Sequence, residues 1–504
     1  MTSVFDEGPF EPCPSPFNMA AYVLEAGLQM PEKDALLILG AAGVERWNYA
    51  ALERAVRGTA TGLLSLGLVP GDRVLMRLGN TVDFPIAYLG ALAAGLVPVP
   101  TSSALTEAET RTVLTTASPA AVLRDPDVAC VPHDLTVDLA QLRGFRDLSP
   151  ATYHMGDPER PGYIVFTSGT SGVPRAVLHA HRAIWARRMM FDGWYDLRPA
   201  DRLLHAGAFN WTYTLGTGLM DPWTQGATAL IPAPGTAAGQ LPDLMAEHGV
   251  TLFAAAPGVY RQMLKDQRIL SLPALRHGLS AGEKLAPRVA ARWRAATGTE
   301  IHEAYGMSEC STFISGAPRR VVRPESLGQP QQGRRVALLD ADGPVPRDTE
   351  GTIAVHRSDP GLMLGYLNAP EETAARMQGD WFLTGDQASM DEEGQITYLG
   401  RNDDMMNAGG YRVSPIEVEA ALAGAPGLTA VAVTDVEVKA DARVIAAFYT
   451  APAALDEAAL ASYVSETLAR YKQPRLYIHL PELPMGANGK ILRRALRAGF
   501  EAAT

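Results

Sequence analysis

Residues 163–175 have the sequence YIVFTSGTSGVPR, and the rest of the chain is interpreted around this stretch. Its first four residues are apolar and partly β-branched, a pattern that predicts a buried strand. Glycine and hydroxyl-bearing residues follow, and then Pro174 and Arg175. Glycines let a backbone turn tightly, and successive amide groups in such a turn form a concavity that holds anions. The stretch therefore predicts a polyphosphate-binding loop, although an ordinary polar loop is the plainer interpretation of these residues taken alone.

The loop differs from a Walker-type phosphate loop, which ends in Gly-Lys-Ser/Thr and opens a helix. Here Pro174 follows shortly after the last glycine, and an apolar run continues at residues 177–178. We therefore expect the loop to join two strands, with a helix beginning later, near Arg182.

Composition excludes several classes of protein. The 504 residues are enough for two to four domains, and a net charge of −11 argues against a nucleic-acid partner. The 3 cysteines are far apart, which favours a reducing compartment without disulfides. The first residues lack a signal-peptide pattern, and the longest apolar run, Ile86–Pro100, is too short to span a bilayer. We expect a soluble, cytoplasmic protein without a membrane span.

The first 150 residues alternate between helical and strand patterns, which predicts a parallel sheet covered by helices. Thr106 and Glu109 form a capping-box pattern at the start of one helix. The expected helices are Trp47–Leu66, Phe84–Ala94 and Thr106–Thr116, and the expected strands are Asp72–Met76, Leu96–Val99 and Ala121–Leu123.

Further motifs follow the loop in a fixed order. They are SAGEK at 280–284, AYGMSE at 304–309, WFLTGD at 381–386, YLGRNDD at 398–404, YKQPR at 471–475 and LPMGANGK at 483–490. Each motif is weak alone, but together with the loop the chain resembles the adenylate-forming superfamily, from about Phe17 to the C-terminus. Within it, the chain looks most like the benzoate and medium-chain acyl-CoA ligases.

The resemblance implies an α/β fold with a large N-terminal domain of helix-covered sheets, residues 1–402. A small, mobile α/β lid, residues 403–504, would carry the catalytic lysine and rotate about a hinge at Asp403. One face of the lid would present Lys490 for adenylation. The other would present Gly409, Gly410, Tyr411 and Arg412 for thioester formation with CoA.

The resemblance also implies the reaction. A carboxylate would attack the α-phosphorus of ATP, and the thiol of the cosubstrate CoA would then accept the acyl group and release AMP. Lys490, Glu309 and Arg175 would be catalytic, and Glu309 would hold Mg²⁺, a hard cation that prefers oxygen ligands. The phosphate loop would comprise Thr167, Ser168, Gly169, Thr170, Ser171 and Gly172. The nucleotide would contact Gly282, Glu283, Lys284, Ala304, Tyr305, Gly306, Met307, Ser308, Asp386 and Arg401.

The resemblance further implies an acyl pocket at Asn210, Trp211, Thr212, Tyr213 and Thr312. Aromatic walls with a few polar groups suit a small ligand, although an ordinary core turn is the plainer interpretation of residues 209–216 taken alone. Trp211 and Tyr213 would restrict its volume. We expect a compact acid, aromatic or short to medium and branched, and the absence of arginine from these segments argues against a dicarboxylate.

The chain departs from the family at the end of the phosphate loop, where Arg175 stands in place of the usual lysine. Arginine keeps the charge and can bind phosphate in a fork. Cys310 is not expected to be a nucleophile, because the family's thiol belongs to the cosubstrate. His179 and His181 lack a third metal ligand at suitable spacing, so we expect them to be structural or solvent-facing.

Two alternatives to an acid–CoA ligase remain open from the sequence. A stand-alone adenylation enzyme would load a separate carrier protein, and a catalytically silent homologue would only bind nucleotide. The partners expected are the small-molecule carboxylate, ATP and CoA. A homodimer is compatible with the sequence, which does not identify the acid or the pathway.

Overall fold

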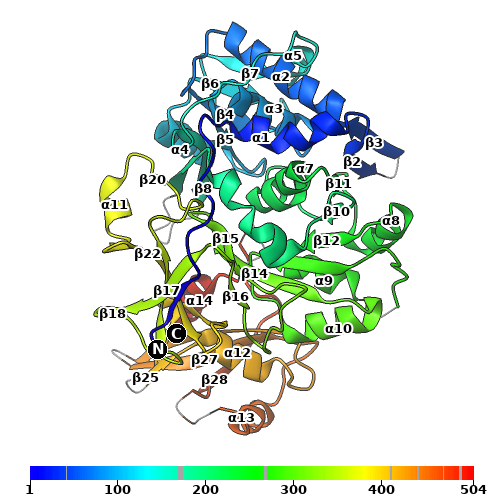
Figure 1. Cartoon of the computed structure of the whole chain (residues 1–504). Coiled ribbons are helices and arrows are strands. Elements are labelled where there is room, and N and C mark those ends of the chain that lie inside the picture. The colour runs from blue at the N-terminus through cyan, green and yellow to red at the C-terminus, as the bar shows by residue number, and fades with distance from the viewer. Residues whose placement is uncertain are drawn as a thin grey trace. The chain divides into compact units, whose positions relative to one another are not determined.

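The computed structural model describes the chain except residues 41–42, 168–173, 266–268, 409–410, 440–441, 469, 471, 487–490 and 504. The backbone divides into two compact units. The larger unit comprises Phe5–Val336 and Val355–Phe382, and the smaller unit comprises Met1–Val4, Ala337–Ala354 and Leu383–Thr504. Helices and parallel strands alternate along the larger unit, which confirms the predicted α/β class (Figure 1).

The central sheet of the larger unit has the strand order β16-β15-β14-β13-β12-β10-β11-β2-β3. Strands β14, β13, β12, β10, β11 and β2 run parallel, whereas β3, β15 and β16 are antiparallel to their neighbours. The strands are β2 (Asp34–Gly40), β3 (Gly43–Asn48), β10 (Arg202–His205), β11 (Thr228–Pro232), β12 (Leu252–Ala255), β13 (His277–Ala281), β14 (Ile301–Met307), β15 (Ser311–Ser315) and β16 (Gln329–Pro330).

Both faces of the central sheet are covered, because successive side chains of a strand point to opposite faces. Leu37 and Leu39 belong to the hydrophobic core that includes α8 (Leu241–Glu247), α9 (Pro257–Met263) and α10 (Pro287–Thr297). Leu36 and Ile38 belong to another core, which includes α1 (Met19–Leu24), α2 (Tyr49–Ser65) and α7 (Asp221–Thr224). The short helical segments of this unit are η1 (Glu25–Gln29), η2 (Phe191–Tyr195), η3 (Thr214–Met220) and η4 (Ala238–Gln240).

The N-terminal sheet has the order β5-β4-β6-β7, and all of its strands are parallel. Its strands are β4 (Arg73–Arg77), β5 (Val97–Pro100), β6 (Ala121–Arg124) and β7 (Thr136–Asp138), accompanied by α2, α3 (Asp83–Ala93), α4 (Glu107–Ala117) and α5 (Leu139–Phe145), drawn in blue and cyan in Figure 1. The predicted elements of this region are confirmed. One helix begins two residues later than expected, at Tyr49, because the Asn48 side chain caps it by accepting from the Ala51 amide. The capping box of Thr106 and Glu109 is present.

The hairpin sheet has the antiparallel order β20-β9-β8 and carries the predicted phosphate loop between β8 (Pro161–Thr167) and β9 (Arg175–Ala180). The third strand is β20 (Gly365–Tyr366), which is followed by α11 (Pro370–Ala374). The prediction that the loop joins two strands is confirmed, and α6 (Ala183–Ala186) begins directly after Arg182.

A further sheet has the order β1-β17-β19-β22-β21, with β18 paired to β17 and β23 to β22. Its strands are β1 (Val4–Asp6), β17 (Arg335–Asp340), β18 (Gly343–Pro344), β19 (Glu350–His356), β21 (Met377–Gln378), β22 (Trp381–Met390) and β23 (Ile396–Arg401).

The C-terminal part of the smaller unit is a small α/β structure. Strand β26 (Ala430–Lys439) pairs antiparallel with β27 (Ala442–Thr450), and β27 pairs parallel with β28 (Leu476–His479). The other elements are η5 (Asn402–Asp404), β24 (Met406–Ala408), β25 (Tyr411–Val413), α12 (Pro415–Leu422), α13 (Glu457–Ser465) and α14 (Arg493–Ala503). The boundary between residues 402 and 403 remains a prediction, since the smaller unit also includes segments before it.

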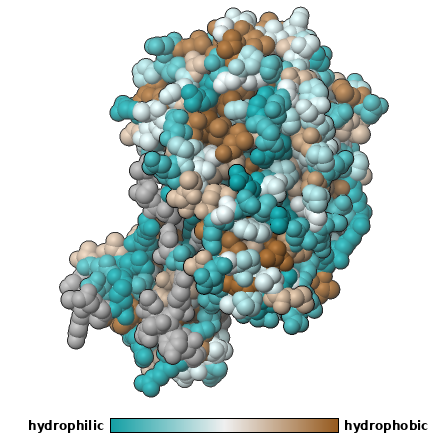
Figure 2. Space-filling view, turned by 60° about the vertical axis from the view of Figure 1, so that its left-hand side comes forward, coloured by the Kyte–Doolittle hydropathy of each residue, from teal (hydrophilic) through white to brown (hydrophobic). Residues whose placement is uncertain are grey.

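The surface in Figure 2 mixes polar residues with separate, small apolar patches. Within the described part of the chain, no helix combines the length and the apolar character that crossing a membrane requires.

Candidate active site

Three predicted binding segments follow parallel strands of the central sheet at their carboxyl ends. Strand β10 ends at His205, β13 at Ala281 and β14 at Met307. Carboxyl ends of parallel strands share one edge of a sheet, which is where ligands of open α/β sheets bind. The segments that follow β10 and β13 meet there, because a Cβ added at Gly282 would lie 3.8 Å from the ring of Trp211. This edge is therefore the candidate active site.

Glu309 lies in the turn between β14 and β15 and is only 8% exposed. The hydroxyl of Tyr366 donates to Oε1 of Glu309 at 2.8 Å. The Glu309 carbonyl accepts from the Met363 amide at 2.8 Å. The carboxylate is thus held by β20 and the backbone by the segment before β20, neither of which the sequence interpretation included in the site.

Arg175 begins β9, directly after the phosphate loop, and pairs across the hairpin with Thr167. Its Nε donates to Oε2 of Glu372 at 2.8 Å, and its guanidinium lies 5.4 Å from the ring centre of Tyr366. The predicted cation therefore stands at the loop, close to the residue that holds Glu309. The other predicted loop residues, Ser168 to Gly172, lie outside the described residues.

Both histidines after the loop are buried, so the solvent-facing interpretation is wrong and the structural one is confirmed. His179 hydrogen-bonds through Nε2 to the Ser308 carbonyl at 2.7 Å and stacks on Tyr163 at 4.8 Å between ring centres. His181 accepts from the Met19 amide through Nδ1 at 3.1 Å. Burial lowers the pKa of His179 to about 4 and that of His181 to about 3. Both rings are therefore neutral near pH 7.

The predicted nucleotide segments of β13 and β14 are neighbours, since Ala281 pairs with Ala304. Gly306 lies opposite Thr312, and the Tyr305 ring packs edge-on against Phe313. Met307 ends β14, and Ser308 is held by His179 as described above. The two strands thus place the AYG and GEK motifs at one edge.

Lys284 makes an ion pair that sequence reasoning missed. Its Nζ lies 3.4 Å from Oε2 of Glu303 and donates to the Glu325 carbonyl at 2.9 Å. Glu303 also accepts from the Leu285 amide at 2.8 Å. Burial raises the pKa of Glu303, although Lys284 acts in the opposite direction. A glutamate inside a strand carries no sequence signal for such a pairing. Glu283 follows Gly282 in the same turn.

Aromatic side chains form the wall of the predicted acyl pocket. The Tyr213 ring stacks on Trp194 at 6.1 Å and stands edge-on to Trp211 at 5.1 Å. Thr312 donates to the sulfur of Met190, which directly precedes the η2 segment that contains Trp194. The structure therefore brings Trp211 and Tyr213 together, with Thr312 contacting the residue before η2.

The other polar residues of the predicted pocket behave differently. Asn210 donates to the Ser103 hydroxyl at 3.3 Å, and Thr212 is exposed. Their roles in the acyl pocket remain predictions.

His205 lies beside the predicted acyl-pocket residues, and the sequence analysis did not single it out. Its ring is fully buried, 4.4 Å from that of Tyr213 and nearly perpendicular to it. Nδ1 accepts from the Gly207 amide at 2.9 Å, which leaves the proton on Nε2. Among the described residues, neither this Nε2 nor the Tyr213 hydroxyl has a hydrogen-bond partner. Burial lowers the pKa of His205 to about 3, so the ring is neutral.

Arg187 lies close to the pocket but is committed to an ion pair. Its guanidinium donates to both oxygens of Asp221, at 2.8 and 2.6 Å, and Asp221 is fully buried. Arg187 also donates to the Ser311 and Thr217 hydroxyls. Its charge is therefore neutralised within the protein.

Cys310, which the sequence analysis did not expect to be a nucleophile, is fully buried. Burial together with the nearby Asp359 raises the pKa of its thiol. Asp359 forms a buried ion pair with Arg334 at 2.6 Å. These surroundings disfavour a thiolate at this position.

The smaller unit contains the remaining described site residues. Asp386 pairs with Arg401 across β22 and β23, and Arg401 Nε lies 3.7 Å from Asp386 Oδ1. The Tyr398 hydroxyl donates to the same oxygen at 3.4 Å. Asp403 lies in η5, and Tyr411 and Arg412 lie in β25. Gly409, Gly410 and Lys490 lie outside the described residues.

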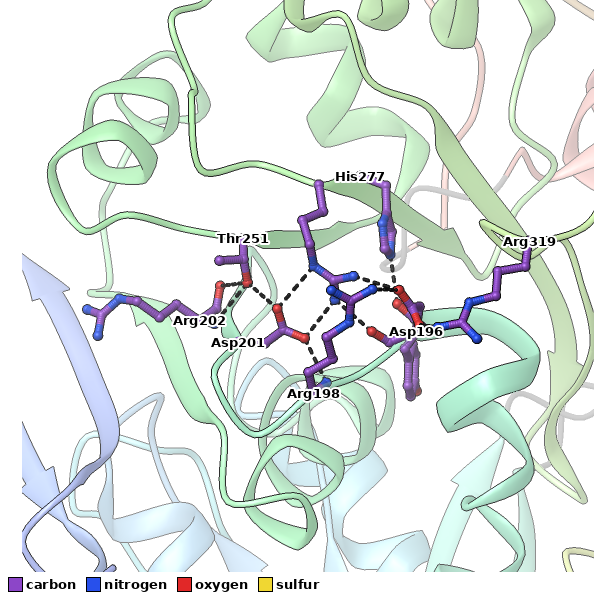
Figure 3. A network of polar contacts seen from close by, with 9 residues as sticks. Asp196, Arg198, Asp201, Arg202, Thr251, His277 and Arg319 are labelled. Carbon is purple, nitrogen blue, oxygen red and sulfur yellow. Dashed lines mark hydrogen bonds and ion pairs between the residues drawn. The ribbon is translucent and has the colours of Figure 1, made fainter.

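A network of charged side chains lies at the amino ends of the central parallel strands (Figure 3). Arg276 joins Asp196 and Asp201, at 2.7 Å each, and Asp201 also accepts from the Thr251 hydroxyl. Asp201, Thr251 and Arg276 immediately precede β10, β12 and β13, so the network ties together the amino ends of these strands. Arg198 and Arg319 also pair with Asp196, and His277 hydrogen-bonds to the Tyr195 carbonyl. These charges satisfy one another, which indicates a structural role.

The chemistry of Glu309 fits Mg²⁺. Tyr366 occupies only Oε1, and the other carboxylate oxygen has no hydrogen-bond partner among the described residues. Within the same residues, no three His, Cys, Asp or Glu side chains are grouped as a metal cage. Mg²⁺ is usually bound by one or two carboxylates together with substrate phosphates, so a single carboxylate beside a phosphate loop is a suitable arrangement.

Comparisons with known proteins identify the family of this chain. The AMP-binding enzyme family matches residues 24–367, and the AMP-binding enzyme C-terminal domain matches residues 417–490. The acyl-coenzyme A synthetase ACSM5, mitochondrial, of Mus musculus is 31% identical over 97% of this chain and 91% of that protein. The human ACSM2A is 28% identical over 96% of this chain and 91% of its own length.

Solved structures of CoA ligases are also similar. An anthranilate CoA ligase in complex with anthranoyl-AMP has a TM-score of 0.88 at 26% identity, covering 97% of this chain and 98% of that one. A benzoate CoA ligase from Burkholderia xenovorans LB400 has a TM-score of 0.84 at 28% identity, covering 95% of this chain and 100% of that one. These relatives do not favour the carrier-loading or silent alternatives. The chain belongs to the AMP-binding enzyme family and is an AMP-forming acid–CoA ligase that uses ATP, Mg²⁺ and CoA.

Proposed function

We propose that this ligase activates a compact carboxylic acid, aromatic or short to medium and branched. The observation that carries the proposal is the aromatic group of Trp211 and Tyr213, which follows the carboxyl end of β10, with Trp194 stacked on Tyr213. Large rings packed edge-on limit the volume beside Gly282, and flat apolar surfaces suit an aromatic acid. The similar structures named as benzoate and anthranilate CoA ligases support this choice.

The polarity of the wall narrows the acid further. Arg187 is paired with Asp221, so it offers no free charge to a second carboxylate, which argues against a dicarboxylate. The Nε2 of His205 and the hydroxyl of Tyr213 are buried polar groups without partners among the described residues, and leaving such groups unpaired costs stability. We therefore propose that the acid carries one polar substituent, such as a ring hydroxyl or amino group.

The residue roles follow the same proposal. The loop from Thr167 to Gly172 holds the β- and γ-phosphates, with Arg175 adding a charged contact. Glu309 binds Mg²⁺, which neutralises phosphate charge. Asp386 and Arg401 hold the ribose, and the segments at 282–284 and 304–308 hold the adenine. Catalysis of this kind depends on positioning a carboxylate beside a polyanion while its charge is neutralised.

Residues 403–504 act as the lid. Lys490 contacts the carboxylate and the α-phosphate in the first step, and Gly409 to Arg412 face CoA in the second. A lid that exchanges faces lets one site bind pyrophosphate and then CoA while excluding water.

We also propose that the protein forms a homodimer and is located in the cytoplasm. Light scattering of the purified chain tests the dimer. Several relatives are named as mitochondrial, so cell fractionation against a matrix marker tests the location.

A matched panel of acids tests the substrate class. Benzoate, hydroxy- and aminobenzoates, isobutyrate, octanoate, palmitate and malonate are compared by CoA-dependent AMP release with ATP and CoA saturating. We expect the highest kcat/KM for a compact monocarboxylate. Preference for palmitate or malonate would contradict the proposal.

Trp211→Ala in the same panel tests the wall itself. The variant should shift kcat/KM toward bulkier acids by roughly ten-fold or more, because one methylene of fit is worth about 1–3 kcal/mol. An unchanged order of preference with lower overall activity would show that Trp211 only packs the core.

A further inference from the structure

Tyr366 contacts two side chains that have separate roles in the proposed reaction. Its hydroxyl donates to Oε1 of Glu309 at 2.8 Å, and its ring lies beneath the guanidinium of Arg175 at 5.4 Å. Tyr366 belongs to β20, which pairs with β9, the strand that Arg175 begins. The ring is 5% exposed, so its position is fixed by packing. One side chain therefore connects the end of the phosphate loop with the predicted Mg²⁺ ligand.

We propose that Tyr366 is the positioning residue of this site, which orients the Glu309 carboxylate toward Mg²⁺ and supports Arg175 at the phosphates. The inference rests on the proposed role of Glu309. A glutamate side chain has several rotatable bonds, and fixing it in one geometry has an entropic cost that a hydrogen bond offsets. With Oε1 held by the phenol, the other oxygen remains for the metal.

The phenol is suited to this task because it stays neutral. A tyrosine hydroxyl is an uncharged hydrogen-bond donor, whereas lysine and arginine side chains are cations. A neutral donor fixes the carboxylate without cancelling its charge, which a lysine or arginine would do. The carboxylate therefore retains its attraction for a divalent cation.

The ring also places Arg175 without committing its charge. The partner of Arg175 is Glu372, whose side chain is 53% exposed. Exposed ion pairs contribute little to stability, so a polyphosphate can replace Glu372 at low cost. The aromatic face beneath the guanidinium remains in place during that exchange.

A second group of the same composition lies away from the site and serves as a matched control. The Tyr153 hydroxyl donates to Oε1 of Glu53 at 3.4 Å, and the guanidinium of Arg57 lies 5.3 Å from the Tyr153 ring centre. This group joins α2 to the segment before the hairpin sheet. Tyr153→Phe therefore removes the same kind of hydrogen bond without touching the proposed site.

The experiment measures ATP binding by titration calorimetry at a series of Mg²⁺ concentrations, for wild type, Tyr366→Phe, Tyr153→Phe and Glu309→Gln. Adenylate formation is followed in parallel over the same Mg²⁺ series. Tyr366→Phe keeps the ring beneath Arg175 and removes only the hydroxyl. We expect it to raise the Mg²⁺ concentration for half-maximal ATP binding by about ten-fold, which matches the loss of one hydrogen bond to a charged group. Tyr153→Phe should leave this concentration unchanged.

The outcomes separate the inference from the proposal beneath it. A higher Mg²⁺ concentration for half-maximal ATP binding in both Glu309→Gln and Tyr366→Phe supports the inference. A shift in Glu309→Gln alone, or an equal shift in both tyrosine variants, overturns it. No shift in Glu309→Gln would show that Glu309 is not the Mg²⁺ ligand, and the proposed role itself would then fail. Melting temperatures within a few degrees of wild type establish that the variants are folded.

Discussion

Arg175 takes the position at which related enzymes are expected to have lysine, and its surroundings suit a guanidinium. The planar group lies over the Tyr366 ring while its Nε reaches Glu372. A compact ammonium ion could not make both contacts in the same way. The substitution is therefore part of a local arrangement that includes β20 and α11.

Arg175→Ala should raise KM for ATP by more than it lowers kcat, because the loop amides would still hold the phosphates. One charged contact is worth roughly 1.5–3 kcal/mol, so the rise in KM should be about ten-fold or more. Steady-state kinetics with ATP varied measure it. Glu372→Gln is the control, since it removes the competing carboxylate and should leave KM equal or lower. An unchanged KM in Arg175→Ala would mean that Arg175 does not meet the phosphates.

At the scale of elements, the hairpin of β14 and β15 depends on Gly306. A Cβ at this position would lie 2.1 Å from the Ser311 carbonyl oxygen and 2.5 Å from the Thr312 Cα, both of them backbone atoms. The register of the two strands also shifts between Tyr305 and Gly306. The close approach of the two backbones is what carries Glu309 to the edge of the sheet.

Gly306→Ala should therefore lower the melting temperature and adenylate formation together, because the backbones must separate to admit the methyl group. Gly144→Ala is the matched control. Gly144 lies in α5 with open space where a Cβ would be, and alanine there should be neutral or stabilising by about 0.5–1 kcal/mol. Thermal unfolding of both variants measures the difference. Equal melting temperatures would contradict the requirement for glycine at 306.

At the scale of the whole molecule, the two half-reactions should separate in Lys490→Ala. The variant should lose adenylate formation but still form thioester from supplied acyl-adenylate, because the proposed role of Lys490 is confined to the first step. Single-turnover assays of each half-reaction measure this. Equal loss in both would mean that Lys490 serves a common structural purpose.

Stability in acid should depend on buried histidines. Burial lowers the pKa of His179 to about 4 and that of His181, His205 and His277 to about 3, from 6.5. Below pH 6.5 the unfolded chain therefore binds more protons than the folded chain. The contribution of each histidine to the free energy of unfolding is therefore complete above that pH. It is lost as the pH falls toward the folded-state pKa, by roughly 2 kcal/mol per histidine at pH 5.

Denaturant unfolding between pH 8 and pH 5 measures how steeply the free energy of unfolding changes with pH. His181→Gln should reduce this pH dependence by the equivalent of about one bound proton. A stability independent of pH in this range would contradict the expectation.

The sequence by itself determined the order of the motifs, the α/β class and the main helices and strands of the first 150 residues. These features depend on local causes, namely apolar periodicity, the capping box of Thr106 and Glu109, and glycine turns. Most candidate site residues could be named for the same reason, because each motif is a short contiguous run. Glu309 and Arg175 are examples, and in the structure both side chains contact Tyr366.

Only the tertiary structure decided which side chains hold these residues. Tyr366 reaches Glu309 from 57 positions away, and His179 reaches Ser308 from 129 positions away, through strands that pair across the hairpin sheet. Such contacts carry no local pattern, because a tyrosine or histidine in a strand looks the same whether it is buried or exposed. The pairing of Lys284 with Glu303 and the burial of His205 beside Tyr213 likewise depend on the order of strands in the central sheet, which brings distant segments to one edge.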